Sequence, residues 1–173
     1  MKKLLLLLIT FVFPVFIFCD IVYPESLYII DLKTGYKIML GTSPYFIERE
    51  YNEPITKKLV ERYFSPDYEY WSIIYDKFEL WYDTYDMIIN KIKIHDQGFS
   101  TSKGVKIGDR LKDIISNYGN PTIHYINSVN CWSIYEYHIF FKEINIDGLY
   151  TVVRFSLLND NIMEIEFSIE REI

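Results

Sequence analysis

The stretch Lys103–Pro121, KGVKIGDRLKDIISNYGNP, places Gly104 and Gly108 four positions apart, a spacing that could form a phosphate-binding turn. A phosphate-binding loop reads G-x-x-x-x-G-K-S/T, in which the lysine contacts the phosphates and the hydroxyl contacts Mg²⁺. Here Asp109 and Arg110 follow Gly108, and a carboxylate at the start of a helix would repel the anion. We therefore interpret this stretch as the beginning and end of a helix.

Other residue types that could support catalysis or metal binding are sparse. The three histidines, His95, His124 and His138, do not form an H-E-x-x-H or related metal-ligand spacing. No serine lies in a G-x-S-x-G turn. Cys131 precedes Trp132 in an apolar segment, which favours a packed thiol over a nucleophile.

Carboxylates are plentiful, and Asp83 and Asp86 stand three positions apart. A solvated turn explains this pair better than a general acid with its base. We therefore expect no catalytic residue, no metal site and no cofactor, and we predict that the chain is not an enzyme.

The amino terminus, MKKLLLLLITFVFPVFIFCD, has the basic start and short apolar core of a secretory signal peptide, which we place at residues 1–19. Leu4–Cys19 has 16 residues, fewer than the ~20 of a spanning helix, although an uncleaved anchor is the alternative. The segment also resembles a bacterial lipoprotein signal with Cys19 as the lipidation candidate. Phe18 and Ile17 stand where that signal prefers small residues, so plain cleavage near Cys19 stays open. In either case we expect an exported protein of the periplasm, the membrane-anchored cell envelope or the medium.

Charge and cysteine content exclude several classes of protein. The formal charge of the chain is −6, and loss of residues 1–19 with Lys2 and Lys3 takes it to −8. An acidic surface argues against nucleic acid and against lying flat on anionic lipid. We therefore expect membrane contact only through the amino terminus. The two cysteines cannot build a disulfide framework, so a hydrophobic core must hold the fold.

Two helices with similar ends are predicted, at residues 42–52 and 109–119. In the second, Leu111, Ile114, Ile115 and Tyr118 follow the i, i+3, i+4, i+7 spacing of one helix face. Asp109 is the predicted N-cap, and Gly119 suits the left-handed residue at the end, before Pro121. The first helix repeats this pattern less strictly: Thr42 or Ser43 caps it, Pro44 lies in its first turn, Ile47 and Tyr51 face inward, and Asn52 ends it.

These helices belong to an apparent internal duplication. Met39–Pro54 aligns with Lys106–Pro121, and Trp71–Ile73 (WSI) recurs at Trp132–Ile134. We also align Phe78–Leu80 with Ile139–Phe141. A period this long predicts two small domains side by side rather than a solenoid.

Alternating strands follow each helix. Ile165, Phe167 and Ile169 alternate with glutamates and a serine, and similar alternation occurs at 77–83, 90–95 and 152–158. Turns are expected at Asn145–Gly148 and Leu158–Asn161. Such strands predict an antiparallel sheet with one apolar face. Ile55–Phe64 fits either a second helix or a strand, and we favour the helix.

A capped helix ending in YG.P, followed by a tyrosine-rich antiparallel sheet and present twice, resembles the β-lactamase-inhibitor-protein-like fold. This fold includes a small lipoprotein of the outer-membrane β-barrel assembly machine, and the likeness extends to many exported bacterial proteins. The resemblance implies an α+β fold of two tandem units, each a short helix or helix pair on one face of an antiparallel sheet, at 20–98 and 99–173. It also implies a concave, aromatic protein-binding surface. Lactamase inhibition is not implied, because the inhibitor's disulfides have no counterpart here.

If Phe78 and Leu80 face the helix, alternation points Trp81 to the other side of the sheet. The predicted protein-binding residues on that outer face are Trp81, Trp132, His138 and Phe140, since large aromatic residues dominate binding energy. Packing of this face between the two units is the alternative. We therefore expect a module that binds an envelope or extracellular protein. The second hypothesis is a small-molecule-binding protein or hydrolase with its site between the units.

Overall fold

The computed structural model describes residues 27–52, 54–62, 68–140 and 149–171. The predicted signal peptide, Cys19 and the turn at Asn145–Gly148 lie outside these residues. The described part contains two α-helices and eleven β-strands. In chain order they are β1 (Tyr28–Asp31), β2 (Lys37–Met39), α1 (Pro44–Tyr51), β3 (Thr56–Arg62), β4 (Glu69–Ile74), β5 (Phe78–Asp83), β6 (Ile89–Ile94), β7 (Phe99–Thr101), α2 (Leu111–Tyr118), β8 (Ile123–Ile126), β9 (Ser133–Phe140), β10 (Leu149–Leu158) and β11 (Asn161–Arg171). No helix in these ranges is long and apolar enough to cross a membrane.

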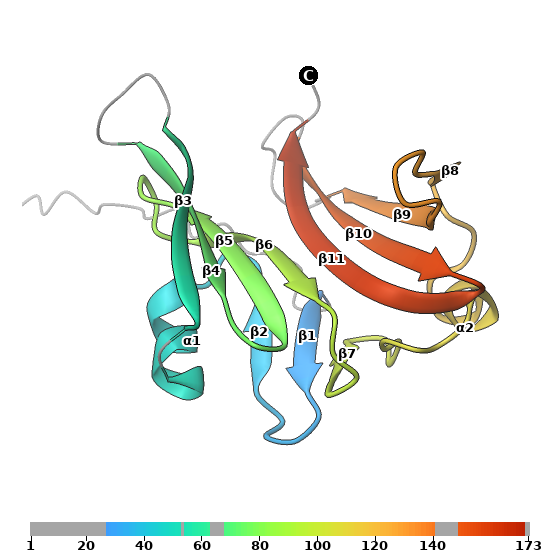
Figure 1. Ribbon diagram of the computed structural model, residues 1–173, viewed down its shortest axis with the longest axis horizontal. Helices are drawn as coiled ribbons and strands as arrows, with labels where there is room; N and C mark the ends of the chain where they lie inside the picture. Colours follow the sequence, from blue (N-terminus) through green and yellow to red (C-terminus); the bar gives the residue numbers. More distant parts are fainter. Residues whose placement is uncertain (1–26, 53, 63–67, 141–148, 172–173) are drawn as a thin grey trace, which may run out of the picture.

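Eight of the strands form one antiparallel sheet in the order β3-β4-β5-β6-β11-β10-β9-β8 (Figure 1). A smaller sheet has the order β2-β1-β7. The small sheet and both helices lie along one side of the large sheet in Figure 1. The protein is therefore mostly β, with two short helices beside a long sheet.

The predicted α+β fold of two separate helix-on-sheet units is wrong. The last strand of each half, β6 and β11, pair with each other, with Ile94 opposite Ile165 and Ile92 opposite Phe167. Alternation within a strand shows which residues share a face but not which strand lies beside it. Pairing β6 with β11 removes two exposed sheet edges and lets both halves share one sheet.

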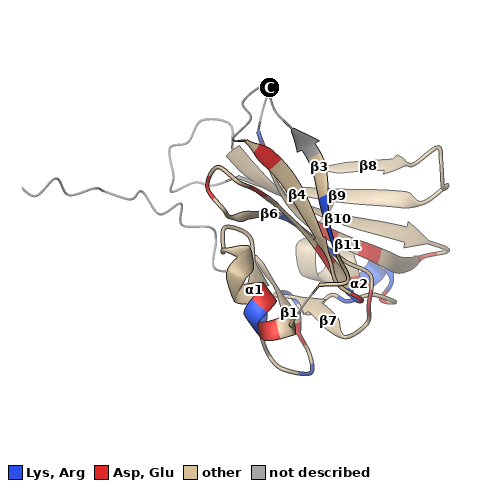
Figure 2. Ribbon diagram, turned by 60° about the vertical axis from the view of Figure 1, so that its left-hand side comes forward, with Lys and Arg blue, Asp and Glu red and all other residues tan. Residues whose placement is uncertain are grey.

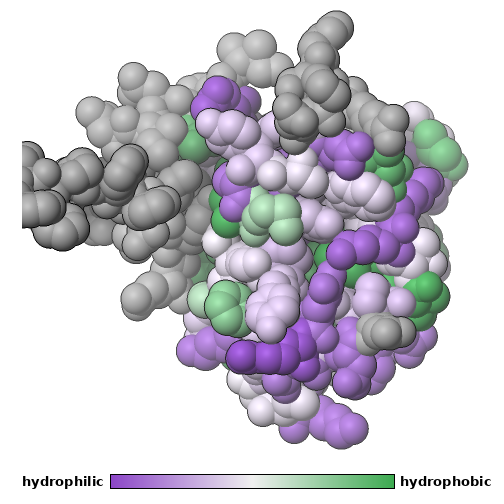
Figure 3. Space-filling view, turned by 90° about the vertical axis from the view of Figure 1, so that its left-hand side faces the viewer, coloured by the Kyte–Doolittle hydropathy of each residue, from purple (hydrophilic) through white to green (hydrophobic). Residues whose placement is uncertain are grey.

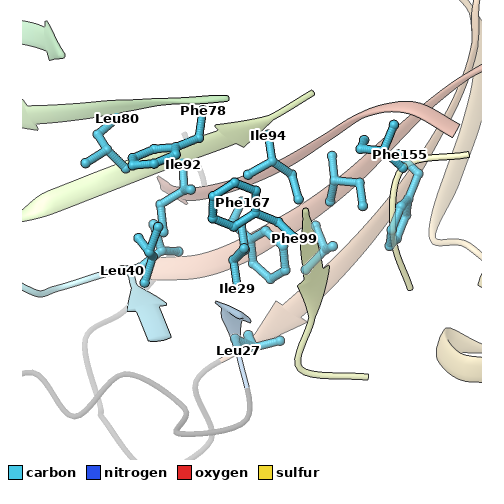
Figure 4. Packing of buried hydrophobic residues seen from close by; sticks show 14 of the residues in the cluster. Leu27, Ile29, Leu40, Phe78, Leu80, Ile92, Ile94, Phe99, Phe155 and Phe167 are labelled. Atoms are coloured by element: carbon cyan, nitrogen blue, oxygen red, sulfur yellow. The ribbon is translucent and has the colours of Figure 1, made fainter. Parts of the chain in front are cut away.

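One hydrophobic core spans the two halves. The fully buried residues include Ile29 and Phe78 from the first half and Phe99, Phe155 and Phe167 from the second. Figure 4 shows these side chains packed in one cluster between the large sheet and the small one. Strand β7 therefore contributes to the same core as strands from both halves.

The helices pack on the apolar face as the sequence predicts. Tyr51 of α1 lies 4.9 Å from Phe78, and Tyr118 of α2 lies 5.1 Å from Phe155, as measured between ring centroids. Matched positions of the duplication thus have matched roles in the two halves. One member of the predicted apolar stripe does not pack inward: Ile115 is 41% exposed, whereas Ile114, one position earlier, is buried.

The helix ends confirm part of the predicted pattern. Asn52 and Gly119 have φ of 62° and 82°, the left-handed region expected where these helices end. Asp109 is not the N-cap: Arg110 holds that position, and its backbone N–H donates to Asp113 Oδ2 at 2.9 Å. Asp109 accepts instead from the Lys106 N–H at 2.9 Å, which closes the preceding turn.

The preferred helix over Ile55–Phe64 is wrong, because its described part forms the edge strand β3. Leu59 and Val60 are adjacent and surrounded by charged residues, so the segment shows no clear period. Pairing with β4 decides its conformation, with Lys58 opposite Ser72. Pairing with the neighbouring strand, rather than the local sequence pattern, thus determines the conformation of this segment.

Candidate functional site: the polar face of the sheet

The face of the large sheet opposite the helices carries a line of alternating charges across five neighbouring strands. Strand register places these five side chains directly opposite one another in the order β5, β6, β11, β10, β9. We call them the charged row: Glu79, Lys93, Glu166, Arg154 and Glu136. Opposite charges at facing positions stabilise a sheet, so the row favours this strand order. Figure 2 shows acidic and basic residues interspersed over the structure, including the centre of the sheet.

Arg154 is the centre of the row. Its Nε donates to Glu136 Oε1 at 2.7 Å, Nη1 donates to Glu166 Oε1, and Nη2 lies 3.5 Å from Glu170 Oε1. The side chains of Glu136 and Glu166 are only 9% and 7% exposed. Two carboxylates are thus buried and paired with one guanidinium, whose planar donors suit several acceptors at once.

Two lysines on β6 extend the network. Lys93 Nζ lies 3.4 Å from Glu164 Oε2 and 3.8 Å from Glu166 Oε2, and Lys91 Nζ lies 3.6 Å from Glu166 Oε1. Glu166 therefore has three cations within ion-pair distance. Such a buried carboxylate needs this compensation, because burial of an unpaired charge is costly.

The contacts between Arg154 and Glu136 shift the pKa values of both groups. Burial by itself would raise the pKa of Glu136, but the hydrogen bond and charge of Arg154 and the Tyr125 hydroxyl lower it below the usual value. The Tyr125 hydroxyl donates to Glu136 Oε1 at 3.0 Å. Burial would lower the pKa of Arg154, but its hydrogen bond to Glu136 and the charge of Glu166 raise it. These groups stay charged near neutral pH and present fixed charges rather than a proton donor or acceptor.

Two of the four predicted binding residues share this polar face. Register continues from Trp81 through Lys91, Ser168 and Val152 to His138, a line parallel to the charged row. Four strand spacings separate Trp81 from His138, which is roughly 19 Å. They therefore mark two ends of an extended surface and do not meet in one small site.

Both residues have local partners. Lys91 Nζ and Lys93 Nζ lie 5.5 and 5.7 Å from the Trp81 ring centroid, a cation–π arrangement. His138 Nε2 lies 3.5 Å from Glu136 Oε2, and its ring lies 5.0 Å from that of Tyr150. Each end of the surface is thus an aromatic ring in contact with a charged side chain.

The other two predicted residues lie away from this line. Trp132 precedes β9 in the turn after β8, where its backbone N–H donates to Asn130 Oδ1 at 3.1 Å. Phe140 is the last residue of β9, and its side chain lies outside the described part. The sequence did not single out Arg154 or Glu136, although alternation already placed Arg154 on the polar side of its strand. The sequence does not reveal the strand order, which brings Glu136, Glu166 and Glu170 around Arg154.

A pocket of about 370 Å³ opens on the helix side of the structure. Its walls include Asp31, Tyr51, Tyr75, Phe78 and Phe99. The Tyr75 and Phe78 rings are stacked with centroids 4.6 Å apart, and Tyr51 meets Phe78 edge-on. Apart from Phe99, the first residue of β7, its lining residues come from the first half.

Both oxygens of one carboxylate in the pocket wall, that of Asp31, accept hydrogen bonds from neighbouring groups. Asp31 Oδ2 accepts from the Tyr51 hydroxyl at 2.9 Å, and Oδ1 accepts from the Lys33 and Thr34 N–H groups at 2.8 and 3.3 Å. Burial would raise the pKa of Asp31, but these hydrogen bonds lower it. Asp31 therefore shapes the turn after β1 and orients Tyr51.

The Tyr75 hydroxyl differs from its neighbours. It is buried and has no hydrogen-bond partner within the described residues. Burial, followed by the charge of Glu48, raises the pKa of Tyr75 to about 12, so the hydroxyl stays protonated. The hydroxyl oxygen is closed to solvent, so a ligand in the pocket would reach this donor after a small movement of the neighbouring side chains.

The remaining candidates for chemistry have structural roles. The His124 ring stacks on Tyr135 at 4.3 Å, and His95 Nε2 lies 3.2 Å from the Asp76 carbonyl oxygen. In the described ranges, no three His, Cys, Asp or Glu side chains are placed to hold a metal ion. The predicted packed thiol is wrong, because Cys131 is exposed in the turn after β8 with φ of 58°.

Asp83 and Asp86 form the turn that the sequence predicts. Asp83 Oδ1 accepts from the Tyr85 and Asp86 N–H groups at 3.0 and 3.1 Å. Burial and then Asp83 raise the pKa of Asp86 to about 6. This shift follows from two carboxylates in one turn and needs no catalytic role.

The sequence matches no known protein-family model and no curated protein. Among solved structures, the crystal structure of YjgB, a DUF4309 family protein from Bacillus subtilis subsp. subtilis str. 168, is similar to this chain. The similarity covers 75% of this chain and 79% of that one, at 10% identity and a TM-score of 0.44. At that level the likeness carries no functional argument.

Proposed function

We propose that this chain is an exported cell-envelope protein that binds another protein through the polar face of its sheet and is not a catalyst. Export rests on the amino-terminal segment, with Cys19 either lipidated or close to the cleavage point. The partner is an envelope or extracellular protein, since the acidic surface disfavours nucleic acid.

The observation that supports this function most directly is the line from Trp81 to His138 beside the charged row. Both helices and the small sheet lie on the apolar side, and no described helix or strand covers the polar face. Ser168 and Val152 in the middle of the line are buried, so the less buried residues toward its ends are those that a partner can contact. The fixed charges and two aromatic ends suit an extended partner, since interfaces favour aromatic residues and ordered polar groups.

Capture from an envelope extract tests this proposal, with Trp81→Ala as the variant. A matched control is Tyr45→Ala, because Tyr45 is an aromatic residue on α1 whose side chain is 64% exposed. The proposal predicts that a partner captured by the wild type and by Tyr45→Ala is lost with Trp81→Ala. The purified partner should then bind the wild-type chain directly. Equal capture by all three proteins would contradict the role of the polar face.

A second candidate function, binding of a small molecule, is favoured by the pocket around Tyr75. Its aromatic walls and its unused hydroxyl donor suit a compact aromatic compound that carries one hydrogen-bond acceptor. Phenol and indole are suitable probes, because phenol offers an oxygen acceptor and indole offers a donor only. Phenol should raise the melting temperature of the wild type more than indole does, and Tyr75→Phe should remove that preference. If neither compound shifts the melting temperature, this second function is wrong.

A further inference from the structure

The two outer strands of the large sheet, β3 and β8, differ in how their edges are protected. Strand β3 carries Lys57 and Lys58, and its pairing with β4 is irregular between Leu59 and Glu61. Charges and bulges of this kind discourage another strand from pairing with an edge. The face that includes α1 and β3 is mostly hydrophilic with isolated hydrophobic residues (Figure 3).

Strand β8 has neither charged side chains nor an irregular pairing with its neighbour. Residues 114–135 contain no Asp, Glu, Lys or Arg, the longest such run in the chain. The side chains of Ile123, Tyr125 and Ile126 are 42%, 43% and 67% exposed. The edge at β8 is thus uncharged, apolar and accessible, at the opposite end of the sheet from β3 (Figure 1).

The backbone of β8 offers hydrogen-bonding groups to a further strand. The Asn127 N–H donates to the Trp132 carbonyl at 2.9 Å, which makes these residues a bonded pair of the β8–β9 hairpin. In an antiparallel pair, bonded and non-bonded residues alternate, so Ile123 and Tyr125 direct their N–H and C=O groups toward β9. His124 and Ile126 therefore direct theirs outward, to the open edge.

We propose that β8 pairs antiparallel with β8 of a second copy of this chain, about a two-fold axis at Tyr125. His124 and Ile126 lie one residue on either side of Tyr125. A two-fold axis there places His124 of each copy opposite Ile126 of the other, and each pair exchanges two hydrogen bonds. The arrangement uses all the outward backbone groups of His124 and Ile126 and joins the two large sheets into one.

The lack of charge on β8 makes this edge the surface at which a second copy can dock. Each chain has a formal charge of −6, so two copies repel one another over most of their surfaces. The β8 edge is the part of the sheet where neither copy brings Asp or Glu on the pairing strand. The two Tyr125 side chains would face each other on the polar side, each beside its own Glu136. The dimer would thus extend the polar face across both copies.

Sedimentation velocity of the purified chain over a range of concentrations tests the dimer. The proposal predicts a concentration-dependent dimer for the wild type and its loss in Ile126→Lys, which places a charge at the edge. Val60→Lys is the matched control, because Val60 is a 48% exposed apolar residue on the other edge strand, β3, and should leave the dimer intact. A wild type that stays monomeric, or a dimer that Ile126→Lys leaves unchanged, would overturn the proposal.

A cross-link tests the axis without depending on the lysine variant. In a non-bonded antiparallel pair the two Cα atoms are about 4.5 Å apart, which lies within the range of a disulfide. Tyr125→Cys combined with Cys131→Ser should form a covalent dimer under mild oxidation, whereas Val60→Cys with Cys131→Ser should not. Equal cross-linking of both variants would show random collision and would overturn the proposed axis. If an extended peptide binds β8 and the chain alone stays monomeric, the edge is a strand-addition site for another protein and the dimer is wrong.

Discussion

Arg154 is the residue on which the polar face depends most. It contacts three glutamates, and two of these carboxylates are less than a tenth exposed. Lys91 and Lys93 neutralise part of the charge on Glu166, whereas the second ion-pair partner of Glu136 among the described residues is His138, which is charged only when protonated. Arg154 is therefore more important to Glu136 than to Glu166.

Arg154→Met should destabilise the fold, since it keeps the length of the side chain but removes the guanidinium from the buried carboxylate of Glu136. Loss of one partner of a buried ion pair costs about 3–5 kcal/mol, and the lower end applies here because Arg154 itself is partly exposed. The comparison is Lys57→Met, which breaks an exposed pair with Glu48 and should cost less than about 1 kcal/mol. Urea unfolding measures both; similar losses would show that the row is not a buried network.

The raised pKa of Asp86 predicts that the stability of the protein depends on pH. Its pKa is raised to about 6 in the folded protein, above the ordinary 3.8, so the folded state binds its proton more tightly. The contribution of this group to stability is therefore favourable at low pH and is lost as the pH rises from about 4 to about 6. Asp86→Asn removes the charge and keeps an acceptor for the Ile88 N–H.

The Asn variant should be more stable than the wild type at about pH 7, and this advantage should shrink toward about pH 4. Urea midpoints at the two pH values measure the change. If the difference in stability between the two proteins does not vary with pH, it does not come from the titration of Asp86.

At the scale of single elements, the two isoleucines of α2 form a matched pair. The sequence places both in one apolar stripe, but Ile114 is fully buried and Ile115 is 41% exposed. Ile114→Ala should cost about 3 kcal/mol, since it removes buried methyl groups and leaves a cavity. Ile115→Ala should cost less than about 1 kcal/mol. Thermal or urea unfolding compares them, and equal costs would mean that the helix packs with a different face.

Local pattern predicted those elements whose residues alternate or recur clearly. The alternation in β5, β10 and β11 and the left-handed ends at Asn52 and Gly119 are confirmed. Strand β3 was missed because its charged side chains follow neither a helical nor a strand period, as expected of a protected edge. The alignment of Phe78–Leu80 with Ile139–Phe141 is also wrong, since the third strand after the second helix is β10.

The order of the strands in the sheet could not be predicted from the local sequence pattern. The pairing of β6 with β11 joins residues such as Ile94 and Ile165, which are far apart in the chain. Both strands have an apolar face, so the sequence permits either two separate sheets or one. The charged row supports the observed order, because opposite charges face each other at every step from β5 to β9.

The whole molecule should unfold as one unit. The core contains Phe78 and Phe99 together with Phe155 and Phe167, and the large sheet runs unbroken from β3 to β8. Neither half can separate without exposing this core and breaking the β6–β11 pairing. Urea unfolding followed by tryptophan fluorescence and by far-ultraviolet circular dichroism should therefore give coincident transitions. Two separate transitions would support independent halves.

The polar face of the whole sheet is the proposed binding surface, and site-specific photocross-linking tests it most directly. A benzoylphenylalanine in place of Trp81 reports what touches that face in the intact envelope, and the same group in place of Tyr45 reports on the side of α1. The account predicts a discrete cross-linked partner from position 81 and none from position 45. A partner that cross-links from position 45 alone, or no adduct from position 81, would contradict it.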